Sequence, residues 1–240
     1  NKNINNIIDG LPIKIFADGP TIDEMTILKT SSISGYTFNP TLFKKLKVTN
    51  YLEFCKKIKK VSGNKSISLE VIADEFNEMV MQARILSKLG RDVYVKIPIS
   101  FTSGKSTVDV IKTLTNENIR LNITAIFTLD QINAILPYIK NASCILSIFG
   151  GRIFDLGLDA VDITGEISEM VHANSNCKVL WASPRMVYDI INACDAHCDI
   201  ITMQSSLIKK LSLFGKTPNE YSMDTVRMFY NDATESGYKL

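Results

Sequence analysis

The chain has 240 residues, of which 45% are hydrophobic, and a formal net charge of +2. This composition allows a domain with a substantial buried core. The near-neutral charge gives no electrostatic reason to expect nucleic acid or a membrane surface as a partner, and the apolar runs are far shorter than a membrane span. Residues 1–10 are polar and lack the basic-then-apolar plan of a signal peptide.

Short apolar runs alternate with helical patterns along the whole chain. Buried parallel strands are predicted at residues 13–18, 33–38, 66–72, 92–97, 121–127, 144–149, 178–182 and 199–203. Amphipathic spacing predicts helices at 50–61, 73–89, 105–117, 129–140, 157–173 and 185–193, and a last one at about 222–237. Strand centres recur at roughly 20 to 35 residues, the length of one unit of a (β/α)8 TIM barrel. Because no linker rich in Pro, Gly or Ser divides the chain, we predict a single α/β TIM-barrel domain over residues 1–240.

The cysteines are scattered and odd in number: Cys55, Cys144, Cys177, Cys194 and Cys198. This pattern favours a reducing cytoplasm over a disulfide scaffold. Cys194, His197 and Cys198 suggest zinc, but they supply few ligands from one short stretch, and no second Cys/His pair in the sequence completes a closed site. We interpret these residues and His172 as structural, and we predict a cytoplasmic protein that needs no metal, nicotinamide or flavin cofactor.

A lysine interrupts the fourth apolar run, VYVKIPI at residues 93–99. Lysine is almost never fully buried without a partner, and a neutral amine in a pocket attacks carbonyls to form Schiff bases. The structural alternative is an edge strand from which Lys96 reaches solvent.

Polar residues recur at the carboxyl ends of the predicted strands, where a barrel carries its chemistry. They are Asp18, Thr37 with Asn39, Glu70, Lys96, Asn122 with Thr124, Ser147 with Arg152, and Ser183 with Arg185. If the barrel closes, they converge on one mouth, which favours a catalytic role for Lys96. Carboxylates beside a buried lysine suit acid/base chemistry at a carbonyl.

The two arginines, each just past a serine at neighbouring strand ends, suit bidentate recognition of a phosphate. The adjacent Gly150 and Gly151 would let the backbone approach that anion. The alternative for each arginine is a surface ion pair.

Seven segments together resemble the transaldolase family, including its short fructose-6-phosphate aldolase-like branch. They are residues 16–18, 35–42, 69–71, 95–98, 122–124, 147–153 and 182–185, spread over about 14–211. The resemblance implies a class I aldolase barrel, sugar phosphate substrates, a place in the pentose phosphate pathway, and a homo-oligomer with the C-terminal helix as a contact.

By that resemblance, Lys96 attacks the C2 carbonyl of a ketose phosphate, and Asp18 takes the C4 hydroxyl proton. Glu70 acts through a water that Thr124 also holds. The implied substrate-binding residues are Thr37, Asn39, Asn122 and Ser147 for the dihydroxyacetone unit, Phe149 near the Schiff base, and Arg152, Ser183 and Arg185 for the phosphate.

Two positions separate the branches of the family. Its aldolases resemble this chain but have Gln where Glu70 stands and Tyr where Phe149 stands. We therefore predict a transaldolase that moves a dihydroxyacetone unit from fructose 6-phosphate or sedoheptulose 7-phosphate to an aldose phosphate.

The alternatives are an aldolase that releases dihydroxyacetone, a related enzyme acting on a specialised sugar, and a non-catalytic sugar-phosphate binder. Phe38 and Pro184 depart from the family pattern and bear on acceptor preference and phosphate geometry.

Overall fold

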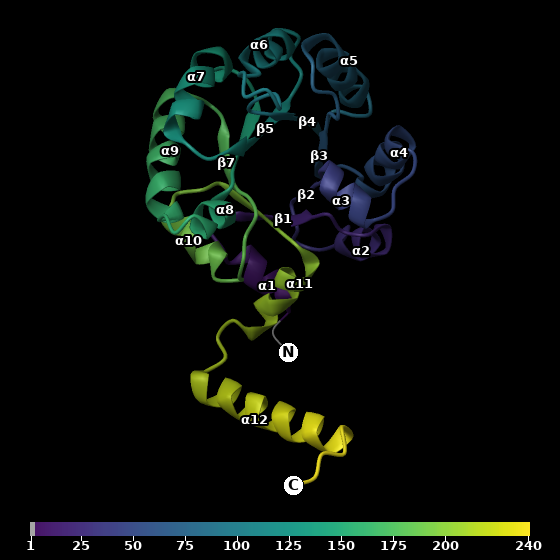
Figure 1. The fold of residues 1–240 in the computed structure, drawn as a ribbon, viewed down its shortest axis with the longest axis vertical. Helices are drawn as coiled ribbons and strands as arrows, with labels where there is room; N and C mark the ends of the chain where they lie inside the picture. The colour runs from purple at the N-terminus through teal and green to yellow at the C-terminus, as the bar shows by residue number, and fades with distance from the viewer. Residues whose placement is uncertain (1–2) are drawn as a thin grey trace.

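A computed structural model describes residues 3–240, so the first two residues of the predicted domain lie outside the described part. Parallel strands close into a barrel (Figure 1), in which they follow one another in sequence order and β8 pairs with β1. The strands are β1 Lys14–Asp18, β2 Gly35–Thr37, β3 Ser66–Glu70, β4 Val93–Pro98, β5 Leu121–Ile126, β6 Cys144–Ile148, β7 Lys178–Trp181 and β8 Ile200–Met203. The predicted (β/α)8 barrel is confirmed.

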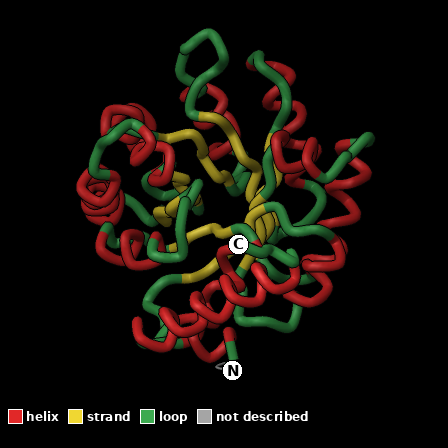
Figure 2. The backbone as a smooth tube through the Cα atoms, turned by 60° about the horizontal axis from the view of Figure 1, so that its bottom comes forward, coloured by secondary structure: helices red, strands yellow, loops and turns green. Residues whose placement is uncertain are grey.

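The helices surround the strands on the outside (Figure 2), except for α12, which lies below the barrel (Figure 1). They are α1 Ile4–Asp9, α2 Ile22–Leu28, α3 Pro40–Lys45, α4 Tyr51–Ser62, α5 Phe76–Ser87, α6 Val108–Asn116, α7 Leu129–Ile139, α8 Gly150–Asp155, α9 Ala160–Asn174, α10 Asp189–Asp195, α11 Ser205–Lys209, the 3-10 turn η1 Lys210–Leu213, and α12 Pro218–Glu235. The sequence analysis missed α1, α2, α3, α8 and α11, which have at most two turns each and show little periodicity. Within residues 3–240 we find no helix with the length and apolar character needed to span a bilayer.

Polar side chains fix where several helices begin. Thr128 and Gln131 form a capping box at the start of α7, and Thr217 and Glu220 form another at the start of α12. Asn39 caps α3, with Pro40 in the first turn, where a missing N–H costs nothing. The caps of α3 and α7 fix where the loops after β2 and β5 end at the barrel mouth.

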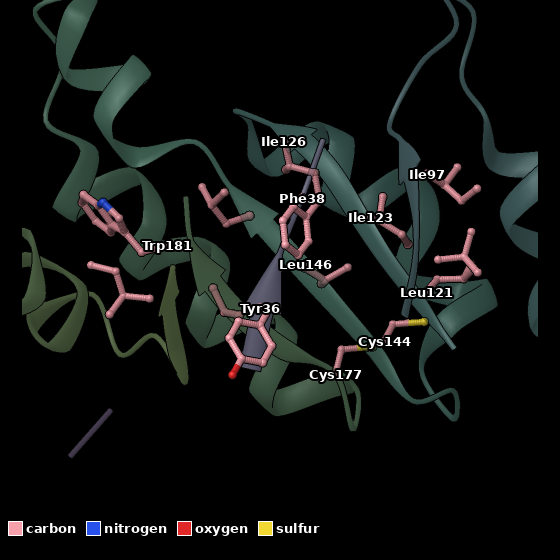
Figure 3. Close-up of a cluster of buried hydrophobic side chains, with 14 of the residues drawn as sticks. Tyr36, Phe38, Ile97, Leu121, Ile123, Ile126, Cys144, Leu146, Cys177 and Trp181 are labelled. Carbon is pink, nitrogen blue, oxygen red and sulfur yellow. The ribbon is translucent and has the colours of Figure 1, made fainter. Parts of the chain in front are cut away.

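Strand alternation divides the buried apolar side chains into two sets. The larger set packs between strands and helices and includes Tyr36, Phe38 and Trp181 (Figure 3). The smaller set forms a separate cluster of Phe16, Ile145, Leu180, Ala182 and Ile200. Because alternate residues of a strand face opposite sides, this smaller cluster lies inside the barrel. It supports the inward polar residues that follow two positions later on β1, β6 and β8.

Phe38, one of the departures from the family pattern, packs on the helix side of the sheet. Its side chain is fully buried, and its ring centroid lies 5.7 Å from that of Phe43 in α3. Phe38 therefore packs behind β2, and its ring does not face the interior of the barrel.

Two glycines allow α8 to lie directly against β7 and the loop that follows it. A Cβ at Gly150 would lie 2.2 Å from the Trp181 ring, and a Cβ at Gly151 would lie 1.6 Å from the carbonyl oxygen of Ser183. Protein packing thus explains both glycines, whereas the sequence analysis assigned them to the approach of an anion.

Replacing Gly151 with alanine should destabilise the protein. The new methyl group meets backbone, which cannot rotate away, and overpacking typically costs about 1 to 3 kcal/mol. Urea unfolding should show a loss of this size. The matched control is Gly165→Ala in α9, where a Cβ meets nothing within 4 Å. This change should stabilise the protein by up to about 1 kcal/mol through helix propensity. Equal midpoints for the two variants would contradict the packing argument.

Candidate active site

Lys96 lies inside the barrel on β4, which pairs with both β3 and β5. Its side chain is nearly inaccessible, with 6% of the residue exposed. The Nζ atom donates a hydrogen bond of 3.0 Å to the backbone carbonyl of Phe38 and lies 4.0 Å from Oε2 of Glu70. The edge-strand alternative for Lys96 is therefore wrong, because β4 has a partner on each side.

Strand register places three polar side chains at one level. Glu70 on β3 is the partner of Lys96, and Lys96 is the partner of Asn122 on β5. Thr124 lies one inward position further toward the mouth, opposite Pro98. Neighbouring strands lie about 4.8 Å apart, so side chains at one level are within reach of a single small ligand.

Asp18 lies across the mouth on β1 and accepts a hydrogen bond of 2.8 Å from the hydroxyl of Thr37. Burial raises the pKa of Asp18 above its ordinary value, while the charge of Lys96 and the Thr37 hydrogen bond act in the opposite direction. Burial likewise raises the pKa of Glu70, and the charge of Lys96 again opposes it. Two carboxyl groups with raised pKa values beside a lysine are suited to taking up and releasing protons.

Asn122 is held from two sides. The Ser147 hydroxyl donates to its Oδ1 over 2.7 Å, and its Nδ2 donates to the Ser68 hydroxyl over 3.0 Å. Sequence analysis predicted Asn122 and Ser147 as site residues but missed Ser68. The available signal was its position two residues before Glu70, which places both side chains on one face of β3.

The hydroxyl of Thr124 is buried and has no hydrogen-bond partner among residues 3–240. The residue after it, Ala125, has a φ of +61° and lies in a register shift between β5 and β6. Buried hydroxyls are normally satisfied by protein or water. An unpaired hydroxyl here is therefore well placed to hold a water or a substrate group.

Arg152, Ser183 and Arg185 come together at the rim formed by α8 and the loop after β7. The backbone N–H of Arg152 donates to the Ser183 hydroxyl over 3.2 Å. The Arg152 guanidinium carbon lies 5.9 Å from the centroid of the Phe149 ring. The predicted phosphate residues and Phe149 thus lie on one side of the mouth.

Arg185 makes a two-point ion pair with Asp155 at the end of α8. Its Nε donates over 3.3 Å to one carboxylate oxygen, and a terminal nitrogen donates to the other. Both side chains are about half exposed, at 46% and 53%. The surface ion pair that the sequence analysis kept as an alternative is therefore present for this arginine.

The loop that carries Arg185 is fixed by the buried carboxylate of Asp189. One carboxylate oxygen accepts the backbone N–H groups of Arg185 at 2.6 Å and Met186 at 3.2 Å. Ser183 has a φ of +52°, an uncommon value for a residue with a side chain. The loop containing Pro184 is therefore a constrained turn.

Asn39 has a structural role that the sequence analysis did not assign to it. Its Oδ1 caps α3 by accepting the backbone N–H of Leu42 at 2.9 Å. Its amide nitrogen can still donate to a ligand, so capping and binding are compatible.

Thr202 on β8 is a site residue that the sequence analysis missed. It is buried at 4% exposure, and its hydroxyl forms a hydrogen bond with that of Thr37. The signal was a lone polar residue in the last apolar strand, at an inward position.

The described residues, 3–240, contain no group of three or more His, Cys, Asp or Glu side chains arranged to hold a metal ion. His197 has a φ of +56° directly after α10, and Nε2 of His172 lies 2.8 Å from a carboxylate oxygen of Asp199. The contact with Asp199 gives His172 a structural role, and the structural interpretation of His197 stays a prediction.

Comparisons with known proteins identify the family to which the chain is similar. The profile of the transaldolase/fructose-6-phosphate aldolase family matches residues 15–239. A probable transaldolase of Desulforapulum autotrophicum is 31% identical over 203 residues, covering 83% of this chain and 90% of the relative. One from Thermoplasma volcanium is 32% identical over 209 residues, covering 85% and 90%, and one from Bartonella tribocorum is 29% identical over 231 residues, covering 95% and 100%.

Among solved structures, a putative isomerase from Sinorhizobium meliloti superposes with a TM-score of 0.55 at 8% identity, over 83% of this chain. This chain spans about half the length of that isomerase, 53%. A mandelate oxidase variant with (S)-mandelic acid gives a TM-score of 0.56 at 12% identity, over 92% of this chain and 73% of the oxidase. Likeness at such low identity concerns the barrel fold alone. The sequence relatives and the family profile carry the assignment: the chain belongs to the transaldolase/fructose-6-phosphate aldolase family.

Proposed function

We propose that this protein is a transaldolase that transfers a dihydroxyacetone unit through a Schiff base on Lys96. One observation supports this above all: a lysine with 6% exposure lies beside Glu70 inside a closed barrel, with Asp18 across the mouth. A lysine so placed has little structural use, whereas a buried amine next to acid/base groups suits covalent carbonyl chemistry.

In the proposed reaction, the neutral amine of Lys96 attacks the C2 carbonyl of a ketose phosphate. The resulting carbinolamine loses water to give the Schiff base, with Glu70 and a water on Thr124 moving the protons. Asp18 then removes the C4 hydroxyl proton as the C3–C4 bond breaks and an aldose phosphate leaves. The electrons of that bond are held by the Schiff base as an enamine.

The second half of the reaction reverses these steps with a new acceptor. The enamine carbon attacks the aldehyde of another aldose phosphate, and Asp18 returns the proton to the new hydroxyl. Water then releases the ketose from Lys96. Asn39, Asn122, Thr37 and Ser147 would hold the dihydroxyacetone hydroxyls during both halves.

Glu70 and Phe149 favour transfer over simple aldol cleavage. The Phe149 ring packs against Phe127, with centroids 5.7 Å apart, and presents no hydroxyl to the mouth. Without a phenol to deliver a proton, the enamine waits for an aldehyde. The cytoplasmic location and the pentose phosphate pathway remain predictions from sequence.

Borohydride treatment in the presence of fructose 6-phosphate should add a reduced dihydroxyacetone unit to Lys96. Peptide mass spectrometry measures the adduct. Lys65 is the internal control, because its Nζ donates to the carbonyls of Leu28, Ser31 and Ile33 and lies outside the mouth. Lys96→Ala should abolish labelling and turnover. An unlabelled Lys96 in folded wild-type protein would refute the proposal.

Acceptor dependence separates the two enzyme alternatives. A transaldolase should turn over only when an aldose phosphate acceptor such as erythrose 4-phosphate is present. Steady release of free dihydroxyacetone without an acceptor would favour the aldolase. A panel of donor and acceptor sugars would reveal a specialised substrate.

Loss of the rim arginines should weaken binding of phosphorylated sugars selectively. Arg152→Ala and Arg185→Ala should each raise KM by roughly 10- to 150-fold, which corresponds to a charged hydrogen bond of about 1.5 to 3 kcal/mol. Steady-state kinetics with phosphorylated and unphosphorylated donors measures the difference. The matched control is Arg84→Ala, which breaks an exposed pair with Glu117 at 2.6 Å on the outer helices. If the rim variants affect both donors alike, the phosphate assignment fails.

The proposal includes a homo-oligomer in which α12 of one copy packs on the barrel of another. All residues of α12 are exposed apart from half-buried Asp224 and Thr225. Met223, Val226, Phe229 and Tyr230 lie on one face and are 54% to 71% exposed. Figure 1 shows α12 below the barrel, joined to it by a short connection after η1. Such an apolar stripe on an exposed helix is costly unless a partner covers it.

The barrel offers a matching surface. A groove of about 370 Å³ between α1, α2 and α11 is lined mainly by apolar side chains, including Ile4, Ile8, Ile27 and Ile208. Helices commonly dock an apolar face into such a groove. The same chain therefore carries both halves of an interface, which supports a second copy as the partner.

Charge on the apolar face of α12 should dissociate the oligomer. We expect Val226→Glu combined with Phe229→Glu to lower the molar mass measured by light scattering to that of one chain. Ile27→Glu, in the groove, should act in the same way. Asn231→Glu, on the opposite face of α12, is the control and should leave the mass unchanged. A monomeric wild-type protein would disprove the oligomer.

A further inference from the structure

We propose that Thr202 is a positioning residue: its hydroxyl orients the hydroxyl of Thr37, and Thr37 holds Asp18 ready for proton transfer. The inference rests on the proposed function for its effect on turnover. Its effect on the ionisation of Asp18 is independent of that function. Thr202 acts through Thr37 and has no assigned contact with substrate.

Three strands contribute to this hydrogen-bonded chain. Thr202 lies on β8 with 4% exposure, and Thr37 lies on β2 with 2% exposure. Thr202 is the register partner of Phe16, while Thr37 is the partner of Asp18 two residues further along β1. Thr202 therefore lies one inward layer deeper than Asp18, where a ligand in the mouth meets Asp18 first.

The order of donors follows from the number of protons. A threonine hydroxyl has one hydrogen, and Thr37 gives it to Oδ1 of Asp18 over 2.8 Å. The contact between the hydroxyls of Thr37 and Thr202 must then use the hydrogen of Thr202. The chain runs from Thr202 to Thr37 to Asp18, and it leaves the second oxygen of Asp18 for the proton of the substrate.

Thr202 also decides which way Thr37 faces. A threonine carries a methyl and a hydroxyl on the same carbon, and a rotation of χ1 exchanges them. With a hydroxyl at position 202, the Thr37 oxygen has a partner on that side. If position 202 carried only methyl groups, that side would favour the Thr37 methyl, and the hydrogen bond to Asp18 would be lost or weakened.

The charged groups around Asp18 do not fully offset the effect of burial on its pKa, so the hydrogen bond from Thr37 still matters. Lys96 on β4 and Lys45 at the end of α3 both stabilise the Asp18 carboxylate, and Glu70 shares Lys96 with it. Burial nevertheless dominates and raises the pKa of Asp18. Thr37 supplies the one uncharged donor that opposes burial, so its loss should raise the pKa of Asp18 further.

The test compares Thr202→Val with wild type. At neutral pH, kcat should fall about 2- to 12-fold, the range covered by one neutral hydrogen bond. A higher pKa leaves less Asp18 carboxylate at a given pH, so the deficit in kcat should shrink as the pH rises. Carbon-13 NMR of the Asp18 carboxyl, assigned with Asp18→Asn, should show its titration midpoint moved upward.

Two further variants test whether the effect of Thr202→Val comes from the orientation of the Thr37 hydroxyl or from altered packing around position 202. Thr202→Ser restores the hydroxyl and should recover both the titration midpoint and kcat. Thr164→Val in α9 makes the same change at a fully buried threonine whose hydroxyl has no partner among residues 3–240, and it should leave both unchanged. If Thr202→Val does not fold, Thr202→Ala provides the same measurement without the added bulk.

The outcomes are distinct for the two proposals. If Asp18 titrates in Thr202→Val as in wild type, or if Thr202→Ser behaves like Thr202→Val, the positioning role is overturned. If wild type forms no adduct at Lys96 but the titration of Asp18 moves as expected, the transaldolase proposal fails and the positioning role stands. A double-mutant cycle should show no further effect of Thr202→Val in a Thr37→Val background.

Discussion

The positive charge of Lys96 faces two buried carboxyl groups, Asp18 and Glu70, inside one closed barrel. Closure is what forces them together, because every second residue of eight strands points into the same small space. Burial penalises a charge on any of the three, and the lysine offsets part of the penalty on both carboxylates. The charge of Lys96 therefore influences the ionisation of both carboxyl groups, which links the two sides of the mouth.

Two hydrogen-bonded sets flank these three groups and fix their geometry. One joins Ser68, Asn122 and Ser147 across β3, β5 and β6, and the other joins Asp18, Thr37 and Thr202 across β1, β2 and β8. Side chains locked in this way need little reorganisation when charge develops on a ligand. The interior is thus built for fixed orientation, whereas the rim with Arg152 and Arg185 is exposed.

How much the sequence predicts depends on how unusual each residue is in its place. Eight apolar runs defined the strands, and Lys96 was conspicuous because lysine is rare in a buried strand. Thr202 and Ser68 were less conspicuous than Lys96, since threonine suits a strand and a serine is unremarkable in one. The link between Thr37 and Thr202 joins residues 165 positions apart, and only closure of the barrel brings them together.

The glycines next to Arg152 show a different limit of sequence reasoning. A tight approach by an anion and a tight approach by the carbonyl of Ser183 both require that Gly151 lack a Cβ. The sequence analysis proposed the anion, and the carbonyl of Ser183 that the structure places there is by itself enough to require glycine. The same ambiguity explains the short helix α8, whose beginning is set by packing against Trp181 and Ser183 rather than by a capping side chain.

The ion pair between Arg185 and Asp155 is compatible with a phosphate at the rim. Exposed pairs contribute about 0 to 1 kcal/mol, whereas a hydrogen bond to a charged partner contributes about 1.5 to 3 kcal/mol. A phosphate dianion can therefore take the arginine from Asp155 at small cost. Until then, the carboxylate keeps the guanidinium near the mouth, on a loop that Asp189 already fixes. An uncharged hydroxyl offers no comparable gain, so under the proposed function this exchange would favour phosphorylated sugars over unphosphorylated ones.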